Sequence, residues 1–176
     1  MMNIKEVKEL FQKEDSYAEK RIEEKLLPYF EKYNYKLYEK ENRDNTDSHI
    51  SNYSNNYYLR YKDNEIEVSY LTYFYNVKED IPNEYYIIIN NTKIRKLISV
   101  RIKKIGDMWT TKFIHWYLEA KSKDFSSDVY GNEGNTFEEK VDHLIDSYIQ
   151  NLEKYAKGVL EGKEWIDGFS PYDGYF

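Results

Sequence analysis

The sequence contains no cysteine. This absence excludes disulfide bonds, thiolate nucleophiles and thiolate metal sites together, because each of them needs the cysteine sulfur. It also fits a reducing compartment, so we expect a cytoplasmic protein.

Long hydrophobic runs are also missing. The first residues, Met1 to Glu6, enter a charged amphipathic pattern directly, without the apolar stretch of a signal peptide. No run in the chain approaches the ~18 consecutive apolar residues of a membrane-spanning helix. The sequence therefore predicts a protein that stays in the cytoplasm without contact with a membrane.

The sequence lacks the motifs of common catalytic and metal sites as well. The histidines His49, His115 and His143 lie in three different predicted elements, and no HExxH motif accompanies them. No glycine-rich phosphate loop follows a predicted strand, and residues 168–171 do not form a nucleophile elbow. We therefore expect no cofactor, no metal ion and no catalytic residues.

The residues that are present favour one folded domain. A chain of 176 residues is about the size of an ordinary domain, so residues 1–176 are expected to form a single one. Aromatic residues make up 18% of the chain, and they bury enough area to offset the loss of chain entropy. Nine of the 20 tyrosines lie between Tyr53 and Ile105 among β-branched residues, which favours a sheet there.

Charge is distributed unevenly along the chain, whose formal net charge is -6. Residues 132–176 carry ten acidic residues against four lysines. A mostly acidic surface disfavours nucleic acid and suits a basic protein partner. The exception is a basic strip in residues 93–104, which contains Lys93, Arg95, Lys96, Arg101, Lys103 and Lys104.

Apolar residues at helical spacing predict a helical N-terminus. The pattern begins at Ile4 and runs to Phe11, and Ser16 to Glu19 has the form of a capping box that opens a second helix. Pro28 is expected to kink or end that helix. Two helices, or one bent helix, are therefore expected at the start of the fold.

A second capping box, Thr136 to Glu139, opens the strongest helical pattern, a single apolar stripe. Gly158 and Gly162 mark the end of this C-terminal helix. Residues 108–121 also place aromatic residues at helical spacing and predict a third helix, although the same residues suit a strand.

Between these helices, alternating apolar and polar residues predict strands. The polar segment 42–56 is expected to be an exposed loop, and Asn90-Asn91 a turn. The last strand carries the basic strip, and a short helix is an alternative for its first half. The expected strands are 35–41, 57–61, 65–71, 84–89 and 94–104.

The predicted fold class is α+β, an antiparallel twisted sheet of about four to five strands with the N-terminal and C-terminal helices packed on one face. The clearest hairpin turns at Asp63-Asn64. The strand after this turn predicts one buried face and one solvated face. Those two faces are Ile66, Val68 and Tyr70 on one side and Glu65, Glu67 and Ser69 on the other.

The solvated face supplies the candidate partner-binding residues. Tyrosine buries a large area at low entropic cost and keeps a polar group, which suits a protein interface. The alternative is that tyrosine is frequent here because it favours strands. The candidate residues are Tyr58, Arg60, Glu65, Glu67, Tyr73, Tyr75 and Tyr85.

Two segments carry a family resemblance. The run from Asn56 to Tyr70 (NYYLRYKDNEIEVSY) and the helix end from Gly158 to Trp165 (GVLEGKEW), together with the helical N-terminus, resemble small α+β bacterial immunity proteins of toxin–immunity systems. The resemblance implies a protein without catalytic residues that neutralises a toxin by binding it, often with an acidic surface against a basic nuclease.

The leading hypothesis is therefore a non-enzymatic protein-binding module, an immunity protein that binds a basic toxin domain. One alternative is a nucleic-acid-binding or accessory phage-defence protein that uses the basic strip, which is otherwise a solvated strand face or a protected edge. Another is a metal-dependent hydrolase with a degenerate carboxylate site around Glu65 and Glu67, with Lys62 nearby. That site would need at least three converging carboxylates.

Overall fold

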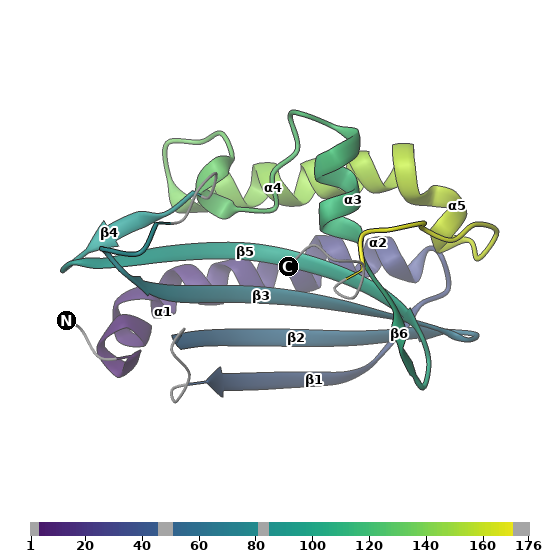
Figure 1. Ribbon diagram of the computed structural model, residues 1–176, viewed down its shortest axis with the longest axis horizontal. Coiled ribbons are helices and arrows are strands. Elements are labelled where there is room, and N and C mark those ends of the chain that lie inside the picture. The colour runs from purple at the N-terminus through teal and green to yellow at the C-terminus, as the bar shows by residue number, and fades with distance from the viewer. Residues whose placement is uncertain (1–3, 46–50, 81–84, 171–176) are drawn as a thin grey trace.

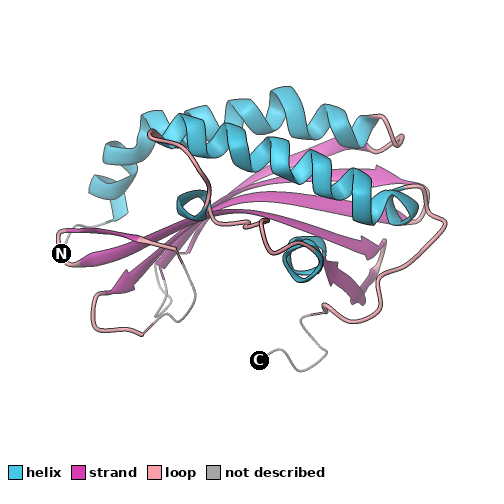
Figure 2. Cartoon of the chain, turned by 90° about the horizontal axis from the view of Figure 1, so that it is seen from above, coloured by secondary structure: helices cyan, strands magenta, loops and turns pink. Residues whose placement is uncertain are grey.

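The chain folds into a six-stranded antiparallel sheet with two long helical segments side by side over one face, as Figure 1 and Figure 2 show. The computed structural model describes residues 4–45, 51–80 and 85–170. The predicted α+β fold class is confirmed, including helices from both ends of the chain on one side of the sheet. No helix in the described residues is long and apolar enough to cross a membrane.

The elements follow one another in a simple order. They are α1 (Ile4–Arg21), η1 (Ile22–Leu26), α2 (Leu27–Glu31), β1 (Lys36–Asn45), β2 (Ser51–Tyr61), β3 (Asn64–Asn76), β4 (Ile87–Ile89), β5 (Thr92–Lys104), β6 (Asp107–Phe113), α3 (Ile114–Lys121), η2 (Val129–Gly131), α4 (Phe137–Asn151), η3 (Leu152–Ala156) and α5 (Lys157–Leu160).

The strands lie in the order β1-β2-β3-β5-β4, and β6 pairs with β5 beside this row. Val68 on β3 lies opposite Tyr57 on β2 and Val100 on β5, so these three side chains share a face. That face packs under the helices and holds the main hydrophobic core. The predicted inward direction of Ile66, Val68 and Tyr70 is confirmed, because all three are fully buried.

The N-terminal helical segment is continuous from α1 through α2. The predicted capping box at Ser16 to Glu19 is wrong, because these residues lie inside α1 and α1 does not end until Arg21. The irregularity comes later, as a wider π-helical turn, η1, just before Pro28. Pro28 follows this turn at the start of α2, and because proline has no N–H it cannot donate a hydrogen bond to the preceding turn.

The predicted capping box of the C-terminal helix is confirmed at the start of α4. The Glu139 backbone N–H donates to the Thr136 hydroxyl over 3.1 Å, and the Thr136 N–H donates to the Glu139 carboxylate over 3.3 Å. These bonds satisfy two donors that the helix cannot pair internally.

Replacing Thr136 with alanine is expected to lower the free energy of unfolding by about 1 kcal/mol, because the Glu139 backbone N–H loses its hydrogen-bond acceptor. Urea unfolding followed by circular dichroism measures this change. Thr136→Ser is the control, since serine keeps the hydroxyl. Equal losses in both variants would contradict a capping role.

The predicted exposed loop at 42–56 is wrong where the structure describes it. Strand β1 continues to Asn45 and β2 begins at Ser51, with Asn42 opposite Asn55 and Arg43 opposite Ser54. Asn, Ser and Asp favour loops, but here the antiparallel ladder supplies partners for their backbones. Residues 46–50 lie outside the described residues.

The helix predicted at 108–121 is only half right. Residues Asp107–Phe113 form β6, because they pair with the end of β5, and the helix is confined to Ile114–Lys121. The strand predicted at 84–89 is shorter than expected and comprises Ile87–Ile89, with residue 84 outside the described residues.

One of the two predicted turns is confirmed, and the other is shifted by one residue. Asn90 and Asn91 are both in the left-handed region, with φ of 48° and 63°, which confirms a tight turn between β4 and β5. The hairpin between β2 and β3 turns one residue earlier than predicted, because Lys62 has the positive φ and Asn64 already belongs to β3. Strand β5 runs unbroken from Thr92 to Lys104, so the helical alternative for its first half is wrong.

The middle of the β5 edge is covered by α3 and the segment after it instead of by another strand. The Ile98 N–H donates to the Ser127 carbonyl over 3.0 Å, and the Tyr148 hydroxyl donates to the Ile98 carbonyl. The His115 imidazole lies 3.3 Å from the Val100 carbonyl. These contacts satisfy backbone groups that would otherwise be buried without partners.

One member of the basic strip lies in the core. The Lys96 side chain is fully buried on the helical side of the sheet, and its Nζ lies 2.6 Å from Asp15 Oδ1 and 3.6 Å from Glu14 Oε2. The Tyr70 hydroxyl donates to the same Asp15 oxygen over 2.5 Å. The prediction of Lys96 as part of a solvated strip is therefore wrong.

Candidate functional site

The face of the sheet opposite α1 and α4 carries the candidate site. We call it the open face, because no long helix lies over it (Figure 2). Its side chains come from alternate positions on neighbouring strands, which the antiparallel register brings into rows. Examples of these rows are Tyr58, Glu67 and Arg101, and Arg60, Glu65 and Lys103.

The structure brings six of the seven predicted partner-binding residues together on the open face. Tyr58 and Arg60 project from β2, and the other four belong to one parity of β3. The strand period of two residues is sufficient to place them, because all six alternate with core residues. The residues on β3 are Glu65, Glu67, Tyr73 and Tyr75.

Glu65 is not solvated, contrary to the prediction, because neighbouring side chains cover it and leave only 4% of the residue exposed. Its carboxylate accepts hydrogen bonds from the Tyr38 hydroxyl at 2.5 Å and from Arg60 Nε at 3.0 Å, and Lys103 Nζ lies 3.3 Å away. Burial acts to raise the pKa of Glu65, but these hydrogen bonds outweigh it and hold the pKa below its usual value.

Replacing Glu65 with glutamine is expected to lower the free energy of unfolding by about 1.5 to 3 kcal/mol, because charge-assisted hydrogen bonds are lost at a buried position. Urea unfolding at pH 7 measures the loss. Glu39→Gln, an exposed position on β1, is the matched control. A loss no larger than that of the control would show that the Glu65 network adds nothing to stability.

Glu67 and Tyr58 occupy the neighbouring row in a second network. Glu67 pairs with Arg101 and accepts a hydrogen bond from the Ser69 hydroxyl at 3.0 Å. The Tyr58 hydroxyl accepts from Arg43 Nη2 at 3.2 Å and donates to Glu41 at 3.0 Å. Burial is the main cause that raises the pKa of Tyr58, so the phenol remains protonated.

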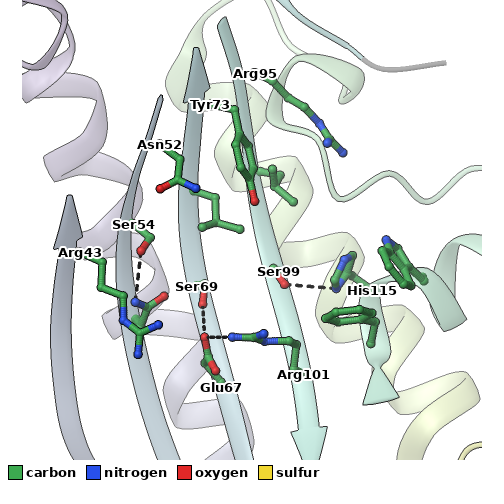
Figure 3. A pocket seen from close by; sticks show the side chains of 15 residues that line it. Arg43, Asn52, Ser54, Glu67, Ser69, Tyr73, Arg95, Ser99, Arg101 and His115 are labelled. Atoms are coloured by element: carbon green, nitrogen blue, oxygen red, sulfur yellow. Dashed lines mark hydrogen bonds and ion pairs between the residues drawn. The ribbon is translucent and has the colours of Figure 1, made fainter. Parts of the chain in front are cut away.

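A pocket of about 290 Å³ lies in the middle of the open face. Its floor consists of small polar side chains where a sheet often carries large ones, so the surface is hollow between the strands. Figure 3 shows Ser69 and Ser99 on adjacent strands, with Arg43 and Arg101 to either side. The buried polar residues of the floor are Ser54, Asn56, Ser69 and Ser99.

One wall of the pocket is aromatic and comes from the junction of β6 and α3. The rings of Phe113 and Trp116 meet edge to face with centroids 4.1 Å apart, and both line the pocket. His115 lies beside them, with Nδ1 3.3 Å from the Ser99 hydroxyl. Burial disfavours the imidazolium and lowers the pKa of His115 to about 3, so His115 is neutral at physiological pH.

The tyrosines divide between the core and the open face. Tyr57 and Tyr70 are fully buried under the helices, whereas Tyr73 and Tyr75 are half-buried on the open face, where their rings stack with centroids 6.0 Å apart. Tyr85, the seventh predicted residue, is 51% exposed. It lines a second pocket that shares Arg95 and Trp116 with the first.

Among the other members of the basic strip, Arg95, Arg101 and Lys103 pair with acids, whereas Lys93 donates to the Glu79 backbone carbonyl. Arg95 contacts both oxygens of Asp128, at 2.5 and 3.2 Å, and Lys103 pairs with Glu65. Lys104 donates to Asn64 and lies over the Trp165 ring. The strip therefore does not present a run of unpaired cations to a phosphate backbone.

No group of three or more His, Asp or Glu side chains in the described residues is placed to hold a metal ion. Glu65 and Glu67 instead bond with neighbouring cations and hydroxyls. The degenerate hydrolase site therefore lacks, within the described residues, the third carboxylate that it requires. His49 lies outside those residues.

Sequence reasoning missed part of the pocket. Arg43, Asn52 and Ser54 fell in the segment predicted as a loop, and His115 and Trp116 were predicted within a helix, which is correct, but their place beside the sheet was not predicted. No alternating pattern marked the first group, because Ser54, Asn55 and Asn56 are consecutive small polar residues. A comparison of the chain with protein-family models, curated proteins and solved structures finds no match.

Proposed function

We propose that this chain is a non-enzymatic binding protein that holds a partner protein on its open face. The observation that carries the proposal is that six of the seven candidate residues lie together on the face that the long helices leave uncovered. Tyr58 and Glu65 are buried there and support the surface, whereas the exposed or partly exposed members are Arg60, Glu67, Tyr73 and Tyr75. Tyr and Arg are the residue types that contribute most to binding energy at protein interfaces.

The side chains of the open face are held in place before any partner arrives. Arg60 lies over the Tyr38 ring at 4.0 Å and donates to Glu65, and Tyr58 bonds with both Arg43 and Glu41. Fixed side chains lose little conformational entropy on binding, which favours affinity.

An exposed apolar tip extends this surface. Strand β6 pairs with the part of β5 that carries Arg101, and the end of this hairpin exposes Ile105 in the turn and Met108 and Trp109 at the start of β6. Trp109 is 70% exposed. A cluster of exposed large apolar side chains beside a polar surface is typical of an interface.

The proposed partner is a basic toxin domain, the class implied by the resemblance to immunity proteins. Glu65 and Glu67 already bond with cations of this chain, so they contribute little free negative charge at the contact itself. The net charge of -6 acts over a longer range and speeds the approach of a basic partner.

The proposal is tested by capture and rescue. The full chain is immobilised, proteins retained from its native host are identified, and each is expressed alone or together with this chain. We expect a retained basic protein that stops growth when expressed alone and no longer does so when this chain is present. Retention of no such protein, or growth arrest that this chain does not relieve, would overturn the proposal.

A further inference from the structure

Two arginines converge on the pocket of the open face from opposite sides. Figure 3 shows Arg43 on β1 and Arg101 on β5 directed toward each other across the two intervening strands, with Glu67 between them. Arg43 is also within electrostatic reach of Glu67, which contributes to the raised pKa of that arginine after its bond with Glu41. One carboxylate therefore lies between two guanidinium groups.

The lining of the pocket contains more arginines than acidic residues. Its charged residues are the guanidiniums of Arg43, Arg95 and Arg101 and a single carboxylate, that of Glu67. Glu41 and Asp128, which pair with two of these arginines, do not line this pocket. Because each of these arginines is paired with a carboxylate, the pocket offers oriented guanidinium donors and not an excess of positive charge.

The guanidiniums also retain hydrogen-bonding capacity. Arg101 donates to Glu67 through Nη2, and Arg43 donates to Glu41 and Tyr58 through Nη2 as well. A guanidinium carries five N–H donors. Among the described residues, the other nitrogens of these two arginines make no hydrogen bond, so they are available to a planar or tetrahedral oxyanion.

The remaining walls suit a ring that carries such a group. The Ser69 and Ser99 hydroxyls on the floor both donate and accept hydrogen bonds, and the indole of Trp116 forms part of one side. The volume of about 290 Å³ admits one small ring compound and is too small for a folded segment of a partner protein.

We infer that this pocket binds a small ring compound that bears a phosphate or carboxylate group, of about the size of a mononucleotide. The oxyanion accepts hydrogen bonds from the guanidinium nitrogens of Arg43 and Arg101 that Glu41, Tyr58 and Glu67 leave unused, and the ring lies against Trp116. The pocket shares Glu67 and Tyr73 with the protein contact proposed above. The inference does not rest on that contact, because it is tested with the purified chain alone.

The test is calorimetric titration of the purified full chain with AMP, with indole-3-acetate and with adenosine, which has the ring but no oxyanion. We expect saturable one-to-one binding of AMP, of indole-3-acetate or of both, and at least 10-fold weaker binding of adenosine. Binding by AMP alone identifies phosphate as the preferred group, and binding by indole-3-acetate alone identifies carboxylate.

Substitutions of the two arginines test whether the anionic compound binds in this pocket. Arg43→Gln and Arg101→Gln should each weaken it by about 10- to 100-fold, the usual effect of losing a charged hydrogen-bond donor. Arg21→Gln, which removes a guanidinium paired with Asp142 on the helical side, should leave it unchanged. Arg43 is exposed, so its variant is expected to fold even if Arg101→Gln does not. No binding by either anionic compound, equal binding of adenosine, or wild-type affinity in Arg43→Gln would overturn the inference.

Discussion

Replacing the buried Lys96 with methionine is expected to lower the free energy of unfolding by about 3 to 5 kcal/mol, because it leaves the buried Asp15 carboxylate without its counterion. Lys96 Nζ lies 2.6 Å from Asp15 and 3.6 Å from Glu14, and 3.7 Å from the centre of the Phe11 ring. Methionine fills the space but supplies neither charge nor hydrogen bonds. Urea unfolding at pH 7 measures the loss.

Two further variants separate charge from packing. Lys25→Met removes a cation from an exposed pair with Asp146 and should change stability by less than about 1 kcal/mol. The double variant Lys96→Met/Asp15→Leu should recover part of the loss, because it also removes the carboxylate that Lys96→Met leaves without a counterion. If Lys96→Met is no less stable than Lys25→Met, the buried ion pair does not stabilise this fold.

The second large effect is acid sensitivity through His115. Burial lowers the pKa of His115 from 6.5 to about 3. Below pH 6.5 the unfolded chain therefore binds a proton at this histidine, whereas the folded chain does not until about pH 3. Stability falls as pH falls across this window by up to about 1.4 kcal/mol per pH unit, which amounts to about 2 kcal/mol at pH 5.

The measurement is the free energy of unfolding between pH 7 and pH 5 for the wild type and for His115→Gln. Glutamine does not titrate, and its amide can donate to the Val100 carbonyl in place of the imidazole. The variant should lose most of this pH dependence, while His143→Gln, an exposed position, should keep it. Parallel curves for the wild type and His115→Gln would show that His115 is not held neutral by burial.

Local signals predicted the parts of the fold that depend on neighbours in sequence. The capping box at Thr136 and the turn at Asn90-Asn91 use contacts within four residues, and both are confirmed. The same form at Ser16 to Glu19 fails, because packing against α4 and the sheet keeps the chain helical through these residues. A cap is only a weak preference when tertiary contacts favour continuation.

Lys96 shows the limit of pattern reasoning. Its position in β5 shares the parity of Ile94 and Ile98, which already indicates the core. Its partner Asp15 lies on α1, far away in sequence, and no local pattern predicts that contact. A lysine in the core is stable only with such a partner, so sequence alone favours the surface.

The sequence predicted which side chains share the open face, but it did not predict the pocket, because the pocket depends on long-range contacts. Strand periodicity placed Glu67 and Tyr73 on one side without any knowledge of the sheet order. The pocket depends instead on a register that aligns Ser69 with Ser99 and on the position of α3, which brings Trp116 to the rim. Both are long-range features that local preferences do not encode.

The most direct test of the central claim, that the open face binds the partner, is the dissociation constant of the captured partner for two matched charge reversals. Arg60→Glu changes the open face, and Lys25→Glu changes the helical side at a similarly exposed residue that also belongs to an ion pair. We predict at least about 10-fold weaker binding for Arg60→Glu and little change for Lys25→Glu. Unchanged binding for Arg60→Glu with a loss for Lys25→Glu would place the interface on the helices and contradict this account.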